Sequence, residues 1–320
     1  MNGKPTTMTS EQLETLLRNT PVNRVEKAEV MYSAPPELHV RGAVINVVIK
    51  RSHDYSFQGE LSTNYQNRYF SSGGANGNFR FSTPKITLDV MYGADNIKTM
   101  EYTDLLSRHT LNNNVYEIMQ NEKLSSKSWM HNVRTALEYN FNEKNHLNVA
   151  YTGSFTPDGH NRSIADGSFQ QSNLDKFTDN KMNNITVQYS SGIGLEVGGD
   201  YTRYTSDNSQ TMFTQLSDKS KNSYTLTGGQ RIDRYSIYAD QKHNLTNNWG
   251  IGYGISYRYA KDYDFQTYDN VSGNIKPENT EAGLNEQTTG FYFSLNKKLG
   301  NRNLILHLCH RRILYHRELS

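Results

Sequence analysis

Leu147-Asn148-Val149-Ala150-Tyr151-Thr152-Gly153-Ser154-Phe155 alternates bulky apolar or aromatic side chains with small or polar ones. Because successive side chains of a strand point to opposite faces, this period of two predicts a β-strand with one apolar face and one polar face. From about residue 56 onward the pattern recurs, and it predicts about ten or eleven such strands. Further alternating rows are Ile86, Leu88, Val90, Tyr92 and Ala94; Val133, Thr135, Leu137, Tyr139 and Phe141; Ile193, Leu195 and Val197; Trp249, Ile251, Tyr253, Ile255, Tyr257 and Tyr259; and Phe291, Phe293 and Leu295.

The connections between these strands alternate between two kinds. Short turns are predicted at residues 83–84, 142–145, 191–192, 246–248 and 300–303, and long polar loops at residues 98–125, 157–180, 206–230 and 262–285. Tight turns at one end and long loops at the other are typical of outer-membrane β-barrels. Aromatic residues near the strand ends fit the girdles of such a barrel, although β-propensity alone also favours them there. These aromatic residues are Tyr65, Tyr69, Phe70, Trp129, Phe141, Tyr201, Tyr204, Trp249 and Tyr263.

The composition agrees with a membrane barrel and argues against other classes of protein. Hydrophobic residues make up only 35% of the chain and the mean hydropathy is -0.79, yet the chain has 22 tyrosines and 12 phenylalanines. A membrane strand exposes every second side chain to lipid, so low average hydropathy is compatible with one apolar face. The net charge of +2 and the scattered basic residues argue against a nucleic-acid partner. The single cysteine, Cys309, excludes an internal disulfide and a four-cysteine zinc site.

Residues 1–52 differ from the rest and are expected to form a small α+β unit. Residues 10–18 begin with Ser10 and place three leucines on one side, which predicts a short amphipathic helix. A strand is predicted from Val25 to Tyr32, and a β-branched-rich strand pair from Leu38 to Lys50.

The sequence from Val25 to Lys50 resembles the end of the plug domain of TonB-dependent outer-membrane receptors, most closely those of the Bacteroides group. In that family a strand like Val25 to Val30 precedes a turn and then a strand that leads into the barrel. The matching motif residues of the second strand are Arg41, Gly42, Ile45, Asn46 and Lys50. We expect these five to be structural residues of a plug, with Gly42 needed for backbone geometry.

This resemblance implies a division of the chain into three parts. Residues 1–52 would be the C-terminal part of a plug domain, and residues 53–303 would be antiparallel transmembrane strands of a partial β-barrel with long extracellular loops. Residues 304–320 gather His307, Cys309, His310 and several arginines into an atypical tail, which a truncation or a frameshift would produce.

The resemblance also implies a function. An intact receptor of this type lies in the cell outer membrane of a Gram-negative bacterium and takes up a ligand with help from a TonB-type energising protein. The ligand would be a glycan, a metal chelate or a peptide, and the sequence does not point to the residues that bind it. Two alternatives are a closed small barrel acting as an adhesin or structural anchor, and a non-functional gene fragment with open sheet edges.

Catalytic and metal-binding motifs find no support. His307, Cys309 and His310 lack a second ligand pair at zinc-site spacing, and the aspartates of residues 262–269 lie in a polar segment without the pattern of a calcium loop. No His-Glu-x-x-His or Gly-x-Ser-x-Gly motif is present. We therefore expect no catalytic residues, no metal and no cofactor, and a protein that is not an enzyme.

Overall fold

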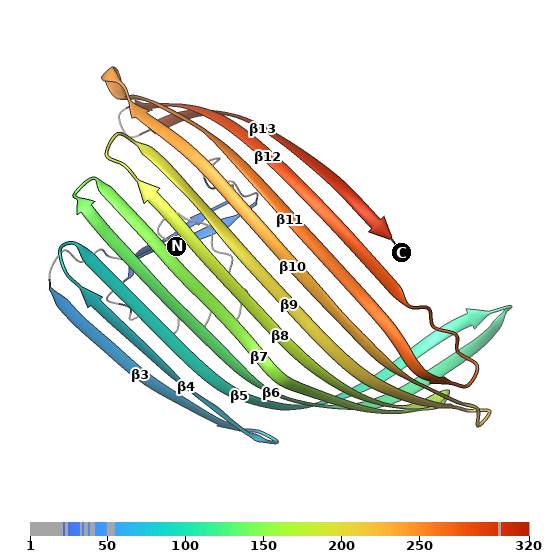
Figure 1. Ribbon diagram of the computed structural model, residues 1–320. Helices are drawn as coiled ribbons and strands as arrows, with labels where there is room; N and C mark the ends of the chain where they lie inside the picture. The colour runs from blue at the N-terminus through green and yellow to red at the C-terminus, as the bar shows by residue number, and fades with distance from the viewer. Residues whose placement is uncertain are drawn as a thin grey trace.

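A computed structural model of the chain contains one large antiparallel sheet and one separate hairpin (Figure 1). The structure describes Val22, Ala34, Leu38 and residues 25–32, 42–49, 55–299 and 302–319. The strands of the large sheet are β3 (Ser56–Asn67), β4 (Ser71–Ser82), β5 (Ile86–Leu111), β6 (Asn114–Asn142), β7 (Asn145–Gly167), β8 (Gln170–Ser190), β9 (Leu195–Leu216), β10 (Lys221–Asn244), β11 (Trp249–Ser272), β12 (Thr280–Leu299) and β13 (Arg302–Leu319).

Each strand of the large sheet pairs with the next one along the chain, which gives a simple meander of eleven strands over the described residues. Figure 1 shows them side by side from β3 in blue to β13 in red, in a curved and twisted sheet. The predicted all-β class is therefore confirmed. The sheet is not closed into a barrel, because β3 and β13 are its two edges and do not pair with each other.

The predicted long loops are wrong, because most of their residues belong to strands. The β5–β6 hairpin stays paired to Leu111 and Asn114, where Asn112 and Asn113 make a two-residue turn with φ of 49° and 65°. Positive φ at both central positions is the type I′ geometry that matches the twist of paired strands. Polar side chains do not prevent pairing, because the ladder is made by the backbone. Segment 273–279 is the longest stretch between strands of the large sheet.

The short turns are confirmed at four of the five predicted places, and they all lie at one end of the sheet, which we call the short-turn end. They connect β4 to β5, β6 to β7, β8 to β9 and β10 to β11. Side chains stabilise them locally: Asn142 Oδ1 accepts the backbone N–H groups of Lys144 and Asn145 at 3.0 and 2.9 Å. Residues 300 and 301 of the fifth predicted turn lie outside the described residues. We call the opposite end of the sheet the hairpin end.

The separate hairpin pairs β1 (Val25–Met31) with β2 (Val44–Ile49). The first strand agrees with the prediction, whereas the described part of the strand pair expected from 38 to 50 contains one strand, β2, which pairs with β1 instead. The helix predicted over residues 10–18 lies outside the described residues. The part of the chain that the structure describes has no helix with the length and hydrophobicity needed to cross a membrane.

Candidate functional site

The register of the large sheet places an apolar row across nine strands. Directly paired residues project to the same face, so one row can be followed from strand to strand. This row consists of Phe57, Phe81, Leu88, Leu137, Val149, Val187, Gly199, Ile237 and Tyr257. We call the surface that carries this row the apolar face. Most of its large side chains are exposed, and Ile237 is 61% exposed.

Two residues farther along each strand lies the next row of the apolar face, and we call this distance one register step. The row one step toward the hairpin end contains Val90, Tyr151, Ile185, Tyr201, Tyr235 and Tyr259. The row one step toward the short-turn end contains Ile86, Tyr139, Leu147, Tyr189, Val197, Ala239, Ile255 and Phe291. These rows together make an apolar belt.

The other surface, the polar face, has the opposite chemistry and the opposite exposure. Its small and polar side chains are largely buried, and Asn184 is only 4% exposed. Burial of polar groups on one side and exposure of apolar groups on the other is the inverse of a water-soluble sheet. Buried polar residues include Arg80, Ser82, Thr87, Asn132, Thr152, Asn184, Asp240, Thr288 and Ser294.

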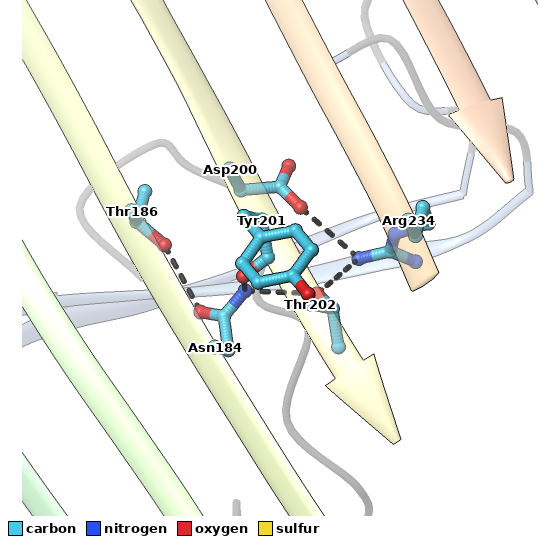
Figure 2. A network of polar contacts seen from close by, with 6 residues as sticks. All are labelled: Asn184, Thr186, Asp200, Tyr201, Thr202 and Arg234. Carbon is cyan, nitrogen blue, oxygen red and sulfur yellow. Dashed lines mark hydrogen bonds and ion pairs between the residues drawn. The ribbon is translucent and has the colours of Figure 1, made fainter. Parts of the chain in front are cut away.

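Hydrogen bonds on the polar face connect β8, β9 and β10 in one network (Figure 2). The side-chain amide of Asn184 donates to Thr202 Oγ1 at 2.9 Å and to the carbonyl of Tyr201 at 3.2 Å, and its oxygen accepts from Thr186 at 3.1 Å. Arg234 donates to Asp200 and to Thr202, both at 3.4 Å. The buried amide therefore has partners on both its donor and its acceptor side.

A second group of charged residues lies on the polar face of β4, β5 and β6. Arg80 and Asp89, which are paired in register, make an ion pair at 3.6 Å. Arg134 on β6 donates to Thr152 on β7 at 3.2 Å. Arginine and acidic side chains thus mix on this face, so it is suited to contact water or a polar partner rather than a hydrocarbon medium.

Four tyrosines on the apolar face point their hydroxyls toward the hairpin end. Each of them lies on a strand that runs from the short-turn end to the hairpin end. Each hydroxyl contacts a polar residue of the following strand, and this residue lies one register step nearer the hairpin end than the tyrosine. The pairs are Tyr92 with His131 Nδ1 at 2.8 Å, Tyr151 with Asn183 at 2.8 Å, Tyr201 with Asp233 at 2.6 Å, and Tyr259 with Asn285 at 3.2 Å. These four are the far tyrosine line.

Two other tyrosines of the apolar face point the opposite way. Tyr189 donates to Asn145 Oδ1 at 3.4 Å, and the Tyr253 hydroxyl lies 3.2 Å from His243 Nε2. Both partners lie one register step nearer the short turns. The tyrosine hydroxyls at the two margins of the apolar belt therefore point away from the centre of the belt. Amphipathic side chains point in this way at the two surfaces of a membrane.

The two tryptophans also lie at opposite margins of the belt. Trp249 begins β11 at the short-turn end, where the Lys297 ammonium lies 4.5 Å from the centre of its ring. Trp129 on β6 lies toward the hairpin end and stacks on His131 at 6.1 Å. His243, the partner of Tyr253, lies in the row of Ile251, and Asn285, the partner of Tyr259, lies in the row of Lys261. These two rows are about ten residues apart along β11. This distance is about 34 Å along a strand and about 26 Å along the normal of a membrane for a strand tilted by ~40°.

The belt runs diagonally across the sheet at an angle that follows from the register. Ile86 is the first residue of β5, whereas Ile255, in the same row, is six residues beyond the start of β11. A stagger of about one residue of 3.4 Å per strand spacing of 4.8 Å corresponds to a tilt of about 35°. Strands of membrane barrels are tilted by a similar angle.

The five predicted plug residues are only partly described. Gly42 has a φ of +92°, a backbone conformation that favours glycine, and Ile45 is exposed opposite Val30. Asn46 is buried and donates to Glu29 Oε2 at 2.8 Å. Hydrogen bonds from Lys27 and then Asn46 hold the pKa of Glu29 below its usual value. Arg41 and Lys50 lie outside the described residues.

The structure corrects one further expectation, the position of Tyr204, and it places a strand in the segment with the atypical composition. Tyr204, expected in an aromatic girdle, pairs with Met182 and Ile232 and lies on the polar face. The atypical tail forms β13, where Leu304, Leu306 and Leu308 are exposed and continue the apolar face beside Lys297, Leu295 and Phe293. Their alternation over 304–308 was the signal available in the sequence, and the arginines and histidines around it obscured it.

Comparison of the chain with protein-family models, with curated proteins and with solved structures gives no match. Function is therefore inferred from the two faces of the sheet and from the tyrosines at the margins of the belt.

Proposed function

We propose that this chain is part of an outer-membrane β-barrel of the TonB-dependent receptor type in a Gram-negative bacterium. The apolar face would contact lipid, and the polar face would line the barrel interior. The observation that carries this proposal is the pair of margins at which tyrosine hydroxyls point away from an exposed apolar belt. In water, each exposed Val, Leu, Ile or Phe of the belt would lack the stabilisation of about 1.5–3 kcal/mol that burial of such a side chain provides.

The hydrogen bonding of the backbone supports the same proposal. Hydrocarbon offers no hydrogen bonds, so a chain can cross it only where neighbouring segments satisfy every N–H and C=O group. Across the apolar belt the meander satisfies these groups, because each of the nine interior strands from β4 to β12 pairs there with a neighbour on both sides. In this proposal the short turns face the periplasm, and the hairpin end extends into the medium outside the cell.

Ligand uptake is the activity that we propose for the receptor to which these strands belong. Support comes from the likeness of Val25 to Lys50 to the end of a plug domain and from the mixed charges of the polar face. The ligand class is a glycan, a metal chelate or a peptide, and a TonB-type protein would supply the energy. The competing hypothesis, a closed small barrel acting as an adhesin or anchor, requires β3 and β13 to pair, and they form open edges.

A pair of adjacent labels tests which face meets lipid. In a Cys309→Ser background, Ser236→Cys and Ile237→Cys place a fluorophore on the polar face and on the apolar face of β10. After reconstitution of the full chain into vesicles, brominated lipid should quench the label at position 237, and aqueous iodide should quench the label at position 236. Equal quenching of both labels by iodide, with none by brominated lipid, would overturn the proposal.

A further inference from the structure

Four positively charged side chains form a cluster on the apolar face, just beyond the far tyrosine line. They come from four consecutive strands, β8 to β11, and all four are exposed. Register connects them: one row contains Arg203, Asp233 and Lys261, and the next row toward the hairpin end contains Lys181, Thr205 and Arg231. We call Lys181, Arg203, Arg231 and Lys261 the cation cluster.

The cluster lies two to four residues beyond tyrosines of the apolar face. Arg203 is two residues beyond Tyr201, Lys261 is two residues beyond Tyr259, and Arg231 is four residues beyond Tyr235 in the same direction. At 3.4 Å per residue these distances are about 7–14 Å along the strand. The apolar stems of lysine and arginine can lie along the surface next to the belt while their charged ends remain in a polar layer.

Carboxylates near the cluster do not neutralise it fully. Asp233, in the same row, accepts the hydroxyl of Tyr201 at 2.6 Å, and Asp179 makes an ion pair with Lys181 at 3.0 Å. Asp207 lies opposite Asp179, in the row beyond the cluster. Within the part of the chain that the structure describes, no ion pair joins Arg203, Arg231 or Lys261 to a carboxylate. Along the strands the apolar rows are therefore followed by the tyrosine hydroxyls and then by the cations with Asp233 among them. The row of Asp179 and Asp207 lies beyond the cations.

We propose that the cation cluster binds the phosphate groups of phosphorylated lipid headgroups at the membrane surface on the hairpin end. This inference rests on the proposed function, because it takes the tyrosine hydroxyls as the margin of the hydrocarbon layer. Phosphates of lipids lie directly above that layer, and guanidinium groups bind them with paired N–H donors. The cluster is continuous with the apolar belt, so a ligand with acyl chains and a phosphate satisfies both, whereas a soluble anion satisfies only the cations.

Flotation of the full chain with vesicles tests the proposal. One set contains phosphatidylcholine alone, a second carries phosphatidic acid, and a third carries oleic acid at the same surface charge as the second. The test variant is Arg203→Gln, Arg231→Gln and Lys261→Gln together. The matched control is Lys219→Gln, Lys221→Gln and Lys276→Gln together, which removes the same charge from exposed positions near the tips of the hairpins.

The native chain and the control variant should bind phosphatidic acid vesicles more tightly than either other set. The test variant should lose this preference, by about fivefold for each cation removed, and it should still float with phosphatidylcholine. Equal losses in both variants, or equal preference for oleic acid, would reduce the effect to surface charge and overturn the proposal. Abolition of the preference by inorganic phosphate at constant ionic strength would assign the site to free phosphate instead.

The two proposals fail in different ways. If the native chain does not float even with phosphatidylcholine, the membrane function itself fails. If it floats with all three sets equally, the belt contacts lipid but the cation cluster does not bind phosphate, and only the further inference is overturned.

Discussion

The hydroxyl of Tyr201 donates to Asp233 Oδ1 at 2.6 Å, from β9 to a carboxylate on β10 that lies one register step nearer the hairpin end. The ring stacks on Tyr235 at 4.7 Å, and Tyr235 in turn stacks on Tyr259 at 6.5 Å. One side chain thus joins the apolar belt to the polar layer beyond it. Tyr201 is therefore the residue at which the margin of the belt can be tested most directly.

Tyr201→Phe should destabilise the sheet by about 0.5–1.5 kcal/mol, because Asp233 loses a hydrogen-bond donor at the margin of the belt. Tyr257→Phe is the control, since Tyr257 lies in the central apolar row and its hydroxyl has no hydrogen bond among the described residues. That change should be neutral or slightly stabilising. Urea unfolding of vesicle-bound protein, followed by tryptophan fluorescence, measures both effects, and a larger loss for Tyr257→Phe would contradict the assigned margin.

Val149→Arg should reduce membrane insertion by about 2–4 kcal/mol, since it places a charge in the central row of the apolar face. Asn148→Arg, on the adjacent residue and the opposite face, should be mild because its side chain meets the polar face. The fraction of protein that floats with vesicles in increasing urea reports the difference. Equal tolerance at the two positions would show that the faces are assigned incorrectly.

Gly194→Ala should disrupt the turn between β8 and β9. Gly194 has a φ of +84°, and an added Cβ would overlap the carbonyl oxygen of Lys242. Strain of this kind costs about 1–3 kcal/mol before the clash is relieved. Gly77→Ala is the control, because a Cβ there meets nothing closer than Leu61 at 3.8 Å. Equal unfolding midpoints for the two variants would contradict the structural role of Gly194 in this turn.

Segment 273–279 should be the first site of cleavage when folded protein is treated with a protease specific for glutamate. Glu278 lies there between β11 and β12, whereas Glu122 and Glu286 lie in paired strands and must first unfold locally. Mass spectrometry of early fragments identifies the cut. Earlier cleavage after Glu122 would show that the β5–β6 hairpin, which projects beyond its neighbours in Figure 1, opens more easily than its pairing implies.

The alternation of residues was sufficient to predict the strands and their two faces. Leu147, Val149 and Tyr151 share the apolar face as expected, and the short turns lie where residues such as Asn142 and Asn145 indicated them. Periodicity succeeds here because the two faces carry different kinds of side chain, so each residue type indicates the direction of its side chain.

The extent of the strands could not be predicted in the same way. In residues 98–125 polar side chains lie on both faces of the hairpin, so the apolar period disappears although the backbone pairing continues. The hydrogen bonds of Tyr201 and Tyr259 could not be predicted either. They depend on which residue of the next strand lies opposite, and the sequence of a single strand does not determine this register. Tyr204, by contrast, could have been placed from the sequence, because it lies three residues from Tyr201 on the same strand and so on the opposite face.

The odd number of strands in the meander limits how its two edges can be satisfied. Direction reverses at every hairpin, and eleven is an odd number, so β3 and β13 run in the same direction over the described residues. Direct pairing of β3 with β13 would create a parallel pair in an otherwise antiparallel sheet. Two copies related by an axis along the membrane normal would have the same problem, because β13 of one copy would meet β3 of the other in parallel. A fully antiparallel cylinder requires an odd number of additional strands between β13 and β3, whichever polypeptide supplies them.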